Sequence, residues 1–507
     1  MFTILVLLAL VAFLWLVYHR RMARVAKIAA HFPHPKPVLP LLGNAWMFAN
    51  KDAAAIFHTV LDLHKQCGPD LVTYGLFGDV QLHVSSPKAI ERILLSKVTK
   101  KNYIYEYLEP WLGSGLLLSF GEKWFQRRKI ITPTFHFKIL EQFLEVFNEE
   151  TDRLVTKLEQ HIGEEEFDMY QYITLHALDS ICETSMGVSI NALDNPDNAY
   201  VQAIKDFGSI VIQRTFSALR SFPLLYFLHP FYWRQRKLIK TMHDFTNSVI
   251  KAKRQALKKK QATGTDGTAS RVVLSDDDGV YGKKRLSFLD LLMNETSMSD
   301  ADIREEVDTF MFEGHDTTTS GIFFSLMALA MHQDIQKRLY EEIGSVLETE
   351  EERHGPLTNG TLQRMKYLDM VIKEVLRVYP SVPIIGRELL EDVEIDGCQV
   401  PRGTAIVVIL YNVHRNAVVF PDPERFDPER FSDDAPGTRG PYDYIPFSVG
   451  ARNCIGQKYA LLEMKVTLVK LLLAYKFSPG KTTDSICIQG DLVLRPSGNM
   501  GLRIERR

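Results

Sequence analysis

The chain has 507 residues, of which 46% are apolar and 24% are charged, and its formal net charge is -2 at pH 7. This is the composition of an ordinary globular protein and gives no indication of a nucleic-acid partner. The length exceeds that of one usual core and suggests two or three domains, although some large enzyme folds are single units.

The chain begins with an apolar segment, residues 2–18, in which Thr3 is the one polar residue. Such a segment just reaches the lower limit of about 17 residues for a helix that crosses a bilayer. A basic cluster follows it and no Lys or Arg precedes it, so the positive-inside rule places the rest of the chain in the cytosol. We expect residues 1–19 to be a retained single-pass anchor. The alternative, a cleaved signal peptide, would need a basic start and a small-residue cleavage site.

Two further segments have a distinctive composition. Residues 20–44 combine the basic cluster with a run of prolines, which hold the backbone extended and exclude helix, so we expect a stiff hinge there. Residues 45–507 are expected to form one folded domain. Within it, residues 258–285 are rich in Lys, Gly, Thr, Ser and Asp and bury too little apolar surface to order themselves. They predict a mobile insertion.

Helical periodicity dominates the folded domain, and strand-like stretches such as residues 400–410 are short. The clearest predicted helices are residues 137–158, 301–332 and 362–378. No internal repeats are evident. The pattern predicts a mainly α fold with small β-sheets, in the α+β class.

The predicted helix 301–332 carries polar residues among apolar neighbours. Glu313, Asp316 and Thr317 are spaced i, i+3 and i+4 and so share a face, and Gly314 leaves room beside them for a flat cofactor or dioxygen. A helical Thr also commonly donates to the carbonyl four residues earlier and merely bends the helix. That interpretation stays open for Thr317.

The most specific segment runs from Phe447 to Gly456 and precedes a helical pattern at residues 458–475. Cys454 would lie at a helix start, where unpaired N–H groups and the helix dipole favour the thiolate, and Gly450 and Gly456 permit a tight turn. The five cysteines are scattered, with no CxxC pair or CxxCH motif, which argues against a disulfide framework, zinc or c-type haem. A lone Cys is more often an inert buried residue.

The segment 447–456 fills every defined position of the signature FxxGxRxCxG and resembles the cytochrome P-450 family, which binds haem through a Cys thiolate. The resemblance covers the chain from the apolar segment to Leu494, with the motifs in the family's order. Residues 137–140, 306–316 and 453–457 resemble more narrowly family 4, whose members typically hydroxylate fatty acids at the terminal carbon. Val449 and Ala451 depart from residues common in close relatives.

The resemblance implies the cytochrome P-450 fold and a role for each matching residue. Cys454 would be the axial ligand of the haem iron, Thr317 would bind dioxygen and Asp316 would relay protons. Glu374, Arg377 and Arg430 would form a buried structural triad, although ExxR alone could be a surface ion pair and a second Pro-Glu-Arg-Phe occurs at residues 423–426. The implied haem contacts are Trp124, Arg128, Arg387, Phe447, Arg452 and Gly456, and Glu313 is a candidate for an ester bond to a haem methyl group.

The implied reaction inserts one oxygen atom of O2 into a C–H bond of a lipophilic substrate, with haem b (iron protoporphyrin IX) as cofactor. No dinucleotide fingerprint is present, so we expect electrons from NADPH to arrive through a membrane reductase, with cytochrome b5 as a second candidate donor. Its docking face would include basic residues such as Lys458. The expected location is the endoplasmic reticulum membrane, with the catalytic domain in the cytosol.

Three alternatives remain. A haem-thiolate isomerase or dehydratase would rearrange peroxides without a reductase, but such enzymes often lose the acid–alcohol pair that is retained here. A hydroxylase of foreign compounds or other lipids would share the same motifs, and a haem or lipid sensor would share the haem alone. By analogy, the substrate-contacting segments are residues 103–119, 210–216, 309–313, 382–385 and 492–493, which are largely apolar.

Overall fold

The computed structural model describes residues 2–95, 99–216, 223–262, 287–295, 297–435, 437, 439–498 and 500–507. The longer α-helices are α1 (Phe2–His31), α2 (Ala53–Cys67), α6 (Gly121–Ile131), α7 (Phe137–Leu158), α8 (Met169–Ile181), α9 (Ala199–Thr215), α10 (Pro230–Ala262), α12 (Asp300–Met331), α13 (Gln333–Val346), α16 (Lys366–Val378) and α18 (Gln457–Ala474). The shorter ones are α3 (Pro87–Leu94), α4 (Tyr103–Glu106), α5 (Glu109–Leu112), α11 (Phe288–Asn294), α14 (Glu350–His354), α15 (Asn359–Arg364) and α17 (Leu410–Val413).

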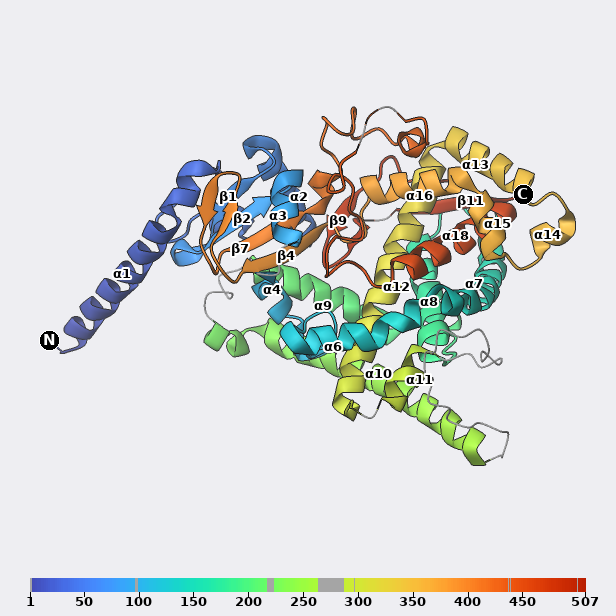
Figure 1. Ribbon diagram of the computed structural model, residues 1–507, viewed down its shortest axis with the longest axis horizontal. Helices are drawn as coiled ribbons and strands as arrows, with labels where there is room; N and C mark the ends of the chain where they lie inside the picture. Colours follow the sequence, from blue (N-terminus) through green and yellow to red (C-terminus); the bar gives the residue numbers. More distant parts are fainter. Residues whose placement is uncertain are drawn as a thin grey trace.

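A five-stranded sheet lies on the side of the molecule that carries α1, and helices fill the other side (Figure 1). Its strand order is β1-β2-β7-β4-β3, in which β2 and β7 are parallel and the other neighbours antiparallel. The strands are β1 (Leu71–Tyr74), β2 (Val80–Val84), β3 (Thr99–Lys100), β4 (Ile384–Leu389), β5 (Val393–Ile395), β6 (Cys398–Val400), β7 (Ala405–Ile409), β8 (Tyr475–Pro479), β9 (Ile488–Gly490), β10 (Leu494–Pro496) and β11 (Leu502–Arg506). The pairs β5–β6, β8–β11 and β9–β10 form small hairpins or ribbons, so the expectation of a mainly α fold with small sheets is confirmed.

The helix α12 runs through the middle of the helical side (Figure 1). A capping box between Ser299 and Asp302 starts it, because each side chain bonds the other's backbone N–H. Every residue from Thr318 to Ala330 is buried, and the helix packs against α8, α16 and α18. The predicted bounds of this helix differ from the observed ones by one residue at each end, and those of α7 agree.

Two predicted elements are divided in the structure. The helix expected over residues 362–378 breaks at Met365, which separates α15 from α16. The stretch 400–410 is interrupted by a turn at residues 401–404, where Gly403 has a φ of 80°, so it contributes to both β6 and β7.

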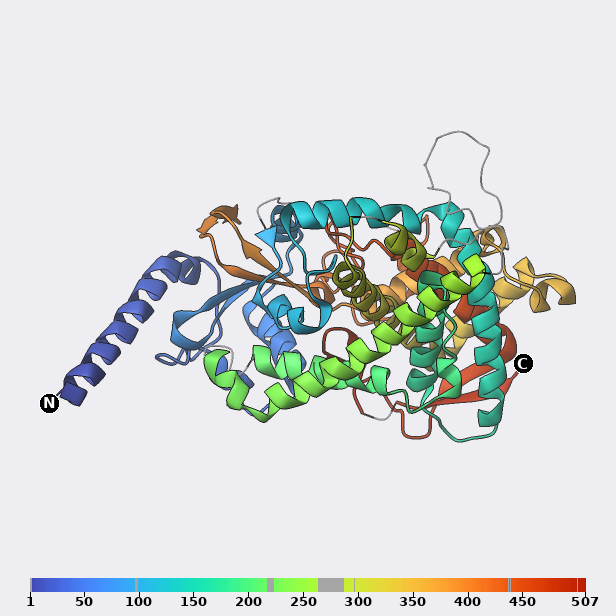
Figure 2. The same cartoon turned by 90° about the horizontal axis from the view of Figure 1, so that it is seen from below.

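The first helix is longer than the predicted anchor. In α1 the window Thr3–Arg20 is long and apolar enough to cross a membrane, and the helix continues to His31 before the prolines begin. The basic part of the predicted hinge is therefore helical, because residues 20–31 are mostly good helix formers and contain no proline. In two views α1 projects from the body (Figures 1 and 2), while Ile28 and Phe32 are buried against the sheet.

The predicted insertion 258–285 begins inside α10, which extends to Ala262, and its remaining residues lie outside those that the structure describes. Two apolar clusters hold the fold together. The larger runs from Phe48 to Ile504 and includes both faces of α12, and the smaller joins the five-stranded sheet to the end of α1. That the residues 45–507 form one domain stays a prediction.

Candidate active site

A cavity of about 320 Å³ lies between α12 and the loop that carries Cys454. One wall is formed by Phe310, Phe312, Glu313, Gly314 and Thr317 of α12. The facing wall is formed by the loop before α18. Each of the segments expected to contact substrate contributes side chains to this cavity, which is lined mainly by apolar groups.

The loop geometry places the sulfur of Cys454 in the cavity. The N–H of Cys454 donates to the carbonyl of Phe447 at 2.9 Å, and that of Asn453 to the carbonyl of Gly450 at 3.1 Å. Gly450 has a φ of 79°, and a Cβ there would lie 2.5 Å from the carbonyl oxygen of Leu94. Only glycine fits this turn without displacing backbone.

The surroundings of Cys454 do not favour the thiolate by themselves, contrary to the expectation from its place before a helix. Burial raises the pKa of its thiol to about 12, the nearby carboxyl of Glu313 adds to this, and the N–H of Gly456 and the charge of Arg128 oppose it. The sulfur is open to the cavity, yet protein atoms surround the cavity itself. A metal cation bound at this sulfur would supply the missing positive charge and remove the proton.

Three cations line the same cavity, Lys101, Arg128 and Arg452, and the charge of Arg387 on β4 acts on Lys101 and Arg452 from close by. Burial and the charges of Arg387 and Arg128 lower the pKa of Arg452 to about 10. Its Nη2 donates to the carbonyl of Ser119 at 2.7 Å and its guanidinium lies 4.1 Å from the ring centre of Trp124. Its Nη1 is buried and has no hydrogen-bond partner among the described residues.

This cationic group fits a flat dianion. Mutually repelling buried cations are costly unless an anion joins them, and arginine matches carboxylates geometrically. Arg128 also ties the cavity to the cysteine loop, because it donates to the carbonyl of Asn453 at 3.0 Å and to the Oδ1 of that residue at 2.9 Å. The residues present therefore fit a haem whose iron meets Cys454 and whose two propionates meet the cations.

Glu313 and Thr317 both line this cavity. Burial raises the pKa of the Glu313 carboxyl to about 7, although the charges of Lys101 and Arg128 act in the opposite direction. Thr317 donates from Oγ1 to the carbonyl of Glu313 at 2.6 Å, which is the helix-bending bond that the sequence left open. The hydroxyl can still accept a hydrogen bond from a ligand, because it retains two lone pairs.

Asp316 does not share the cavity face with these two residues, so that expectation is wrong. The Oδ2 of Asp316 accepts from Nη2 of Arg495 at 2.6 Å, and Nη1 of Arg495 donates to the hydroxyl of Tyr170 at 3.0 Å. A buried arginine needs a buried counter-charge, and Arg495 is too distant in sequence to be anticipated from helical spacing. In the direction that a side chain would take, the room beside Gly314 is filled, because a Cβ there would lie 2.6 Å from Cδ1 of Ile181 on α8, while Gly314 itself still lines the cavity.

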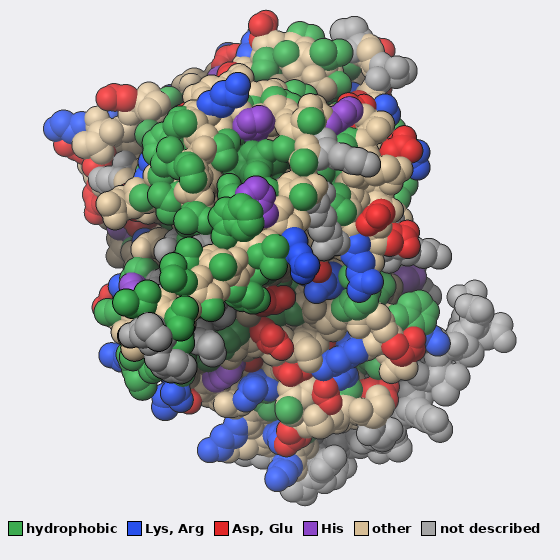
Figure 3. Space-filling model, turned by 90° about the vertical axis from the view of Figure 1, so that its left-hand side faces the viewer, with side chains coloured by type: hydrophobic (Ala, Val, Ile, Leu, Met, Phe, Trp, Pro, Cys, Tyr) green, Lys and Arg blue, Asp and Glu red, His purple; other side chains and the backbone are tan. Residues whose placement is uncertain are grey.

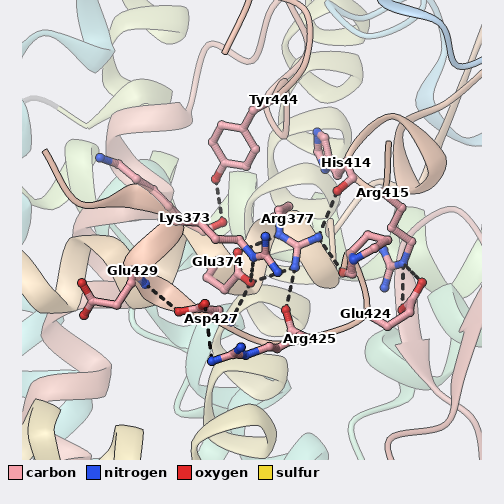
Figure 4. Close-up of polar contacts among 12 residues, drawn as sticks. Lys373, Glu374, Arg377, His414, Arg415, Glu424, Arg425, Asp427, Glu429 and Tyr444 are labelled. Carbon is pink, nitrogen blue, oxygen red and sulfur yellow. Dashed lines mark hydrogen bonds and ion pairs between the residues drawn. The ribbon is translucent and has the colours of Figure 1, made fainter. Parts of the chain in front are cut away.

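The residues Glu374, Arg377 and Arg430 are brought together beneath the helical core. The Nε of Arg377 lies 2.7 Å from Oε2 of Glu374, and the Nε of Arg430 lies 3.5 Å from Oε1. Figure 4 shows the guanidinium of Arg377 among acceptors from several segments. Arg425, from the second Pro-Glu-Arg-Phe, contributes only its backbone carbonyl, and its side chain is 70% exposed.

Basic residues that flank a motif are usually solvated, but of the two neighbours of Arg128 only Lys129 is exposed, and Arg127 is buried. Its side chain is 9% exposed and pairs with Asp302 and Glu306 of α12, whereas Lys129 is exposed. Lys101 and Arg495 are the site residues that sequence reasoning missed. Neither belongs to a recognisable motif, and only their approach to the cavity or to Asp316 in three dimensions marks them.

The model of the cytochrome P-450 family matches the chain over residues 33–502. The chain belongs to the cytochrome P-450 family. It is 41% identical to cytochrome P-450 4c3 of Drosophila melanogaster over 500 residues, which cover 97% of this chain and 92% of that protein. It is 39% identical to cytochrome P-450 4V2 of Homo sapiens over 497 residues, with 96% and 92% covered. As a cytochrome P-450 of family 4, the chain is a monooxygenase that uses haem b and O2.

Proposed function

We propose that this cytochrome P-450 hydroxylates fatty acids or similar lipid chains at or near the terminal carbon. The observation that carries the proposal is the cavity itself, which is lined mainly by apolar side chains and which Glu313, Thr317 and Cys454 all line. An elongated apolar chain can fill the mainly apolar part of such a cavity. When bound to the thiolate, the haem activates O2 for insertion into a C–H bond.

The chain's own residues orient and protect this reaction. The cations Lys101, Arg128, Arg387 and Arg452 would hold the propionates, and Trp124 stacks on Arg452. Phe447 would shield the sulfur from water, and the N–H of Gly456 would temper its donor strength. Thr317 would present its hydroxyl to the bound oxygen, and Asp316 would take part in proton relay from its place beside Arg495.

The test is product analysis with a panel of saturated fatty acids, using the purified full chain with a reductase and NADPH. We expect alcohols at the terminal or adjacent carbon, formed in proportion to NADPH consumed. Products confined to other lipids or to foreign compounds would contradict the substrate class, and product formation from a lipid peroxide without NADPH would favour the isomerase alternative.

We also propose that Glu313 forms an ester with a haem methyl group during turnover. A carboxyl on the cavity wall, one helical turn before Thr317, can reach the edge of a flat group between α12 and Cys454. Acid-denaturing chromatography after turnover tests this. Haem should remain with the wild-type polypeptide and separate from Glu313→Ala, and complete separation from both would contradict the linkage.

The proposed electron donor is a membrane reductase or cytochrome b5, and the proposed location is the endoplasmic reticulum membrane. Lys129 and Lys458 are exposed near the cysteine loop and can face an acidic surface of a membrane reductase or of cytochrome b5. The apolar part of α1 would anchor the protein in the endoplasmic reticulum membrane. Apolar side chains also gather on the face from which α1 projects (Figure 3), and Leu41, Leu42 and Trp46 are exposed just after the helix.

A further inference from the structure

Asp491 is a buried acid in the turn between β9 and β10, and it lines the cavity. Because β9 packs against α2 and β10 against α12, the turn is held from two sides. The side chain of Asp491 is 2% exposed, and its Oδ1 has no hydrogen-bond partner among the described residues. A buried carboxyl oxygen without a donor is unfavourable, so this position is suited to a ligand that brings a donor.

The groups around Asp491 do not satisfy it, because their donors are distant or used elsewhere. The Nε2 of Gln489 donates to Oδ2 of Asp491 at 3.5 Å, which is long for a hydrogen bond. The Nε of Arg495 lies 3.8 Å from the same oxygen, which is too far. The Nη2 of Arg495 donates to Asp316 at 2.6 Å, and its Nη1 donates to the hydroxyl of Tyr170 at 3.0 Å. The guanidinium beside Asp491 is therefore committed mainly to another acid.

The carboxyl of Asp491 is mostly ionised at neutral pH. Burial raises its pKa to about 6, the charge of Asp316 acts in the same direction, and the charges of Arg495 and Lys205 oppose them. A pKa about one unit below pH 7 leaves most of the population charged. The ionised carboxylate accepts hydrogen bonds and repels a second carboxylate.

The other charged groups of the cavity do not compensate for this repulsion. Lys101, Arg128 and Arg452 line the cavity, but they belong to the group that fits the haem propionates. Among the described residues of the lining, no further Lys or Arg occurs. His83 also lines the cavity, and burial lowers its pKa to about 3, so it stays neutral. A lipid with a free carboxylate would therefore meet Asp491 without a cation to offset the repulsion.

We propose that Asp491 selects lipids whose polar group donates a hydrogen bond, such as a hydroxyl, over lipids with a free carboxylate. The inference rests on the proposed action on lipid chains and narrows the substrate class. The hydroxyl of the lipid donates to Oδ1 of Asp491, and its chain lies against apolar residues such as Leu492 and Val493. Fatty acids remain ligands, but weaker ones. Asp491 is thus a specificity-determining residue.

The test compares dodecane, 1-dodecanol and dodecanoate, which have the same chain length, as ligands of the full-length holoprotein. The shift of the Soret band during titration gives the Kd of each ligand. The wild type should bind dodecanol about tenfold more tightly than dodecanoate, because dodecanol gains a hydrogen bond to a charged group and dodecanoate meets a like charge. Tighter binding of dodecanoate would overturn the proposal, and this comparison needs no variant.

Asp491→Asn is the diagnostic variant. Asparagine has nearly the same shape, removes the negative charge and adds an N–H donor. Dodecanoate should bind several-fold more tightly to this variant and dodecanol several-fold more weakly. Dodecane has no polar group, so its Kd should be unchanged. Equal changes for all three ligands would mean that the substitution disturbs the cavity, and an unchanged ratio of the dodecanol and dodecanoate Kd values would mean that Asp491 does not contact the polar group. Either result would overturn the proposal.

Asp484→Asn is the matched control, because Asp484 is exposed in the loop before β9 and loses the same charge. It should leave all three Kd values unchanged. If it alters the ratio as much as Asp491→Asn does, the overall charge sets the preference and the proposal fails. Absence of binding by all three ligands would contradict the proposed lipid class, and this inference with it. Normal binding of dodecane with no preference between the other two would contradict only the role of Asp491.

Discussion

Two arginines, the buried Arg377 and the half-buried Arg452, show how a structural network differs from a binding site. An arginine has five N–H donors. Those of Arg377 make five hydrogen bonds, to both oxygens of Glu374 and to the carbonyls of His414, Pro423 and Arg425. Among the described residues, the side chain of Arg452 makes one hydrogen bond, to the carbonyl of Ser119, and its Nη1 has no partner. A saturated guanidinium, whose N–H donors are all bonded to protein acceptors, connects segments of the fold. A guanidinium with free donors beside other cations is suited to an anionic ligand.

The largest expected effect is the loss of thiolate ligation when Cys454 in the cavity is replaced. Cys454→Ala should abolish the red-shifted Soret band of the reduced carbon monoxide complex, because no other sulfur lines the described cavity apart from that of Met464. Difference spectroscopy measures this, with Cys487→Ala, an exposed cysteine, as the matched control. A thiolate-type band that survives in Cys454→Ala would mean that another residue binds the iron.

Arg377→Ala should cost about 3–5 kcal/mol of the free energy of unfolding, since it leaves the buried carboxylate of Glu374 without its partner. Denaturant unfolding of the haem-free protein measures this loss. The control is Arg425→Ala, which removes an exposed side chain and should change stability by less than about 0.5 kcal/mol. Equal effects of the two substitutions would break the distinction between the saturated network and its surface neighbour.

The saturated network should also be sensitive to acid through His414. Burial, with the charges of Arg415 and Arg377, lowers the pKa of His414 to about 3, and its Nε2 accepts the N–H of Ile445 at 3.0 Å. The unfolded chain binds the proton more tightly, at a pKa of about 6.5, so stability is full above that pH and falls as pH decreases toward 3. The loss should reach about 2 kcal/mol at pH 5. His414→Gln should flatten this dependence, and an unaltered slope would assign it to another group.

Arg452→Ala should weaken haem binding and leave the stability of the haem-free protein unchanged, whereas Arg377→Ala should lower that stability. The haem-free protein should keep its stability, because the substitution relieves repulsion from Arg387 and Arg128. Haem should be held more weakly by about 10- to 150-fold, which corresponds to about 1.5–3 kcal/mol for a hydrogen bond to a charged group. The rate of haem transfer to a haem-scavenging protein measures this, with Arg452→Lys as an intermediate. Destabilised haem-free protein with normal haem retention would place Arg452 in the structural class.

The sequence predicted what depends on local pattern. The ends of α7 and α12, the turn at Gly450 and the position of Cys454 before α18 follow from periodicity, capping and glycine spacing. Partners distant in the chain were not predictable in this way. Helical spacing placed Asp316 beside Thr317 but could not reveal Arg495. No local pattern shows that Asp302 and Glu306 of α12 reach Arg127 on another helix.

The electrostatics of the site depend on the same tertiary contacts. A helix start favours a thiolate, but enclosure by the whole fold outweighs it at Cys454 and raises the pKa of its thiol. The triad of Glu374, Arg377 and Arg430 shows how two similar motifs take different positions in the fold. Two copies of Pro-Glu-Arg-Phe look alike in sequence, and the family resemblance assigned the second one to the triad. In the fold Arg430 lies beside Glu374 while Arg425 turns outward.

The continuity of α1 turns its first and last turns into one rigid lever. Ile28 and Phe32 pack against the sheet, and the window Thr3–Arg20 would lie in the bilayer. The number of helical residues between the bilayer and the sheet would therefore set the rotation of the catalytic domain about the helix axis. Each inserted residue would turn the body by about 100° relative to the membrane, whereas seven would return it to nearly the same angle. Reductase-supported turnover should therefore vary periodically with the length of this helix.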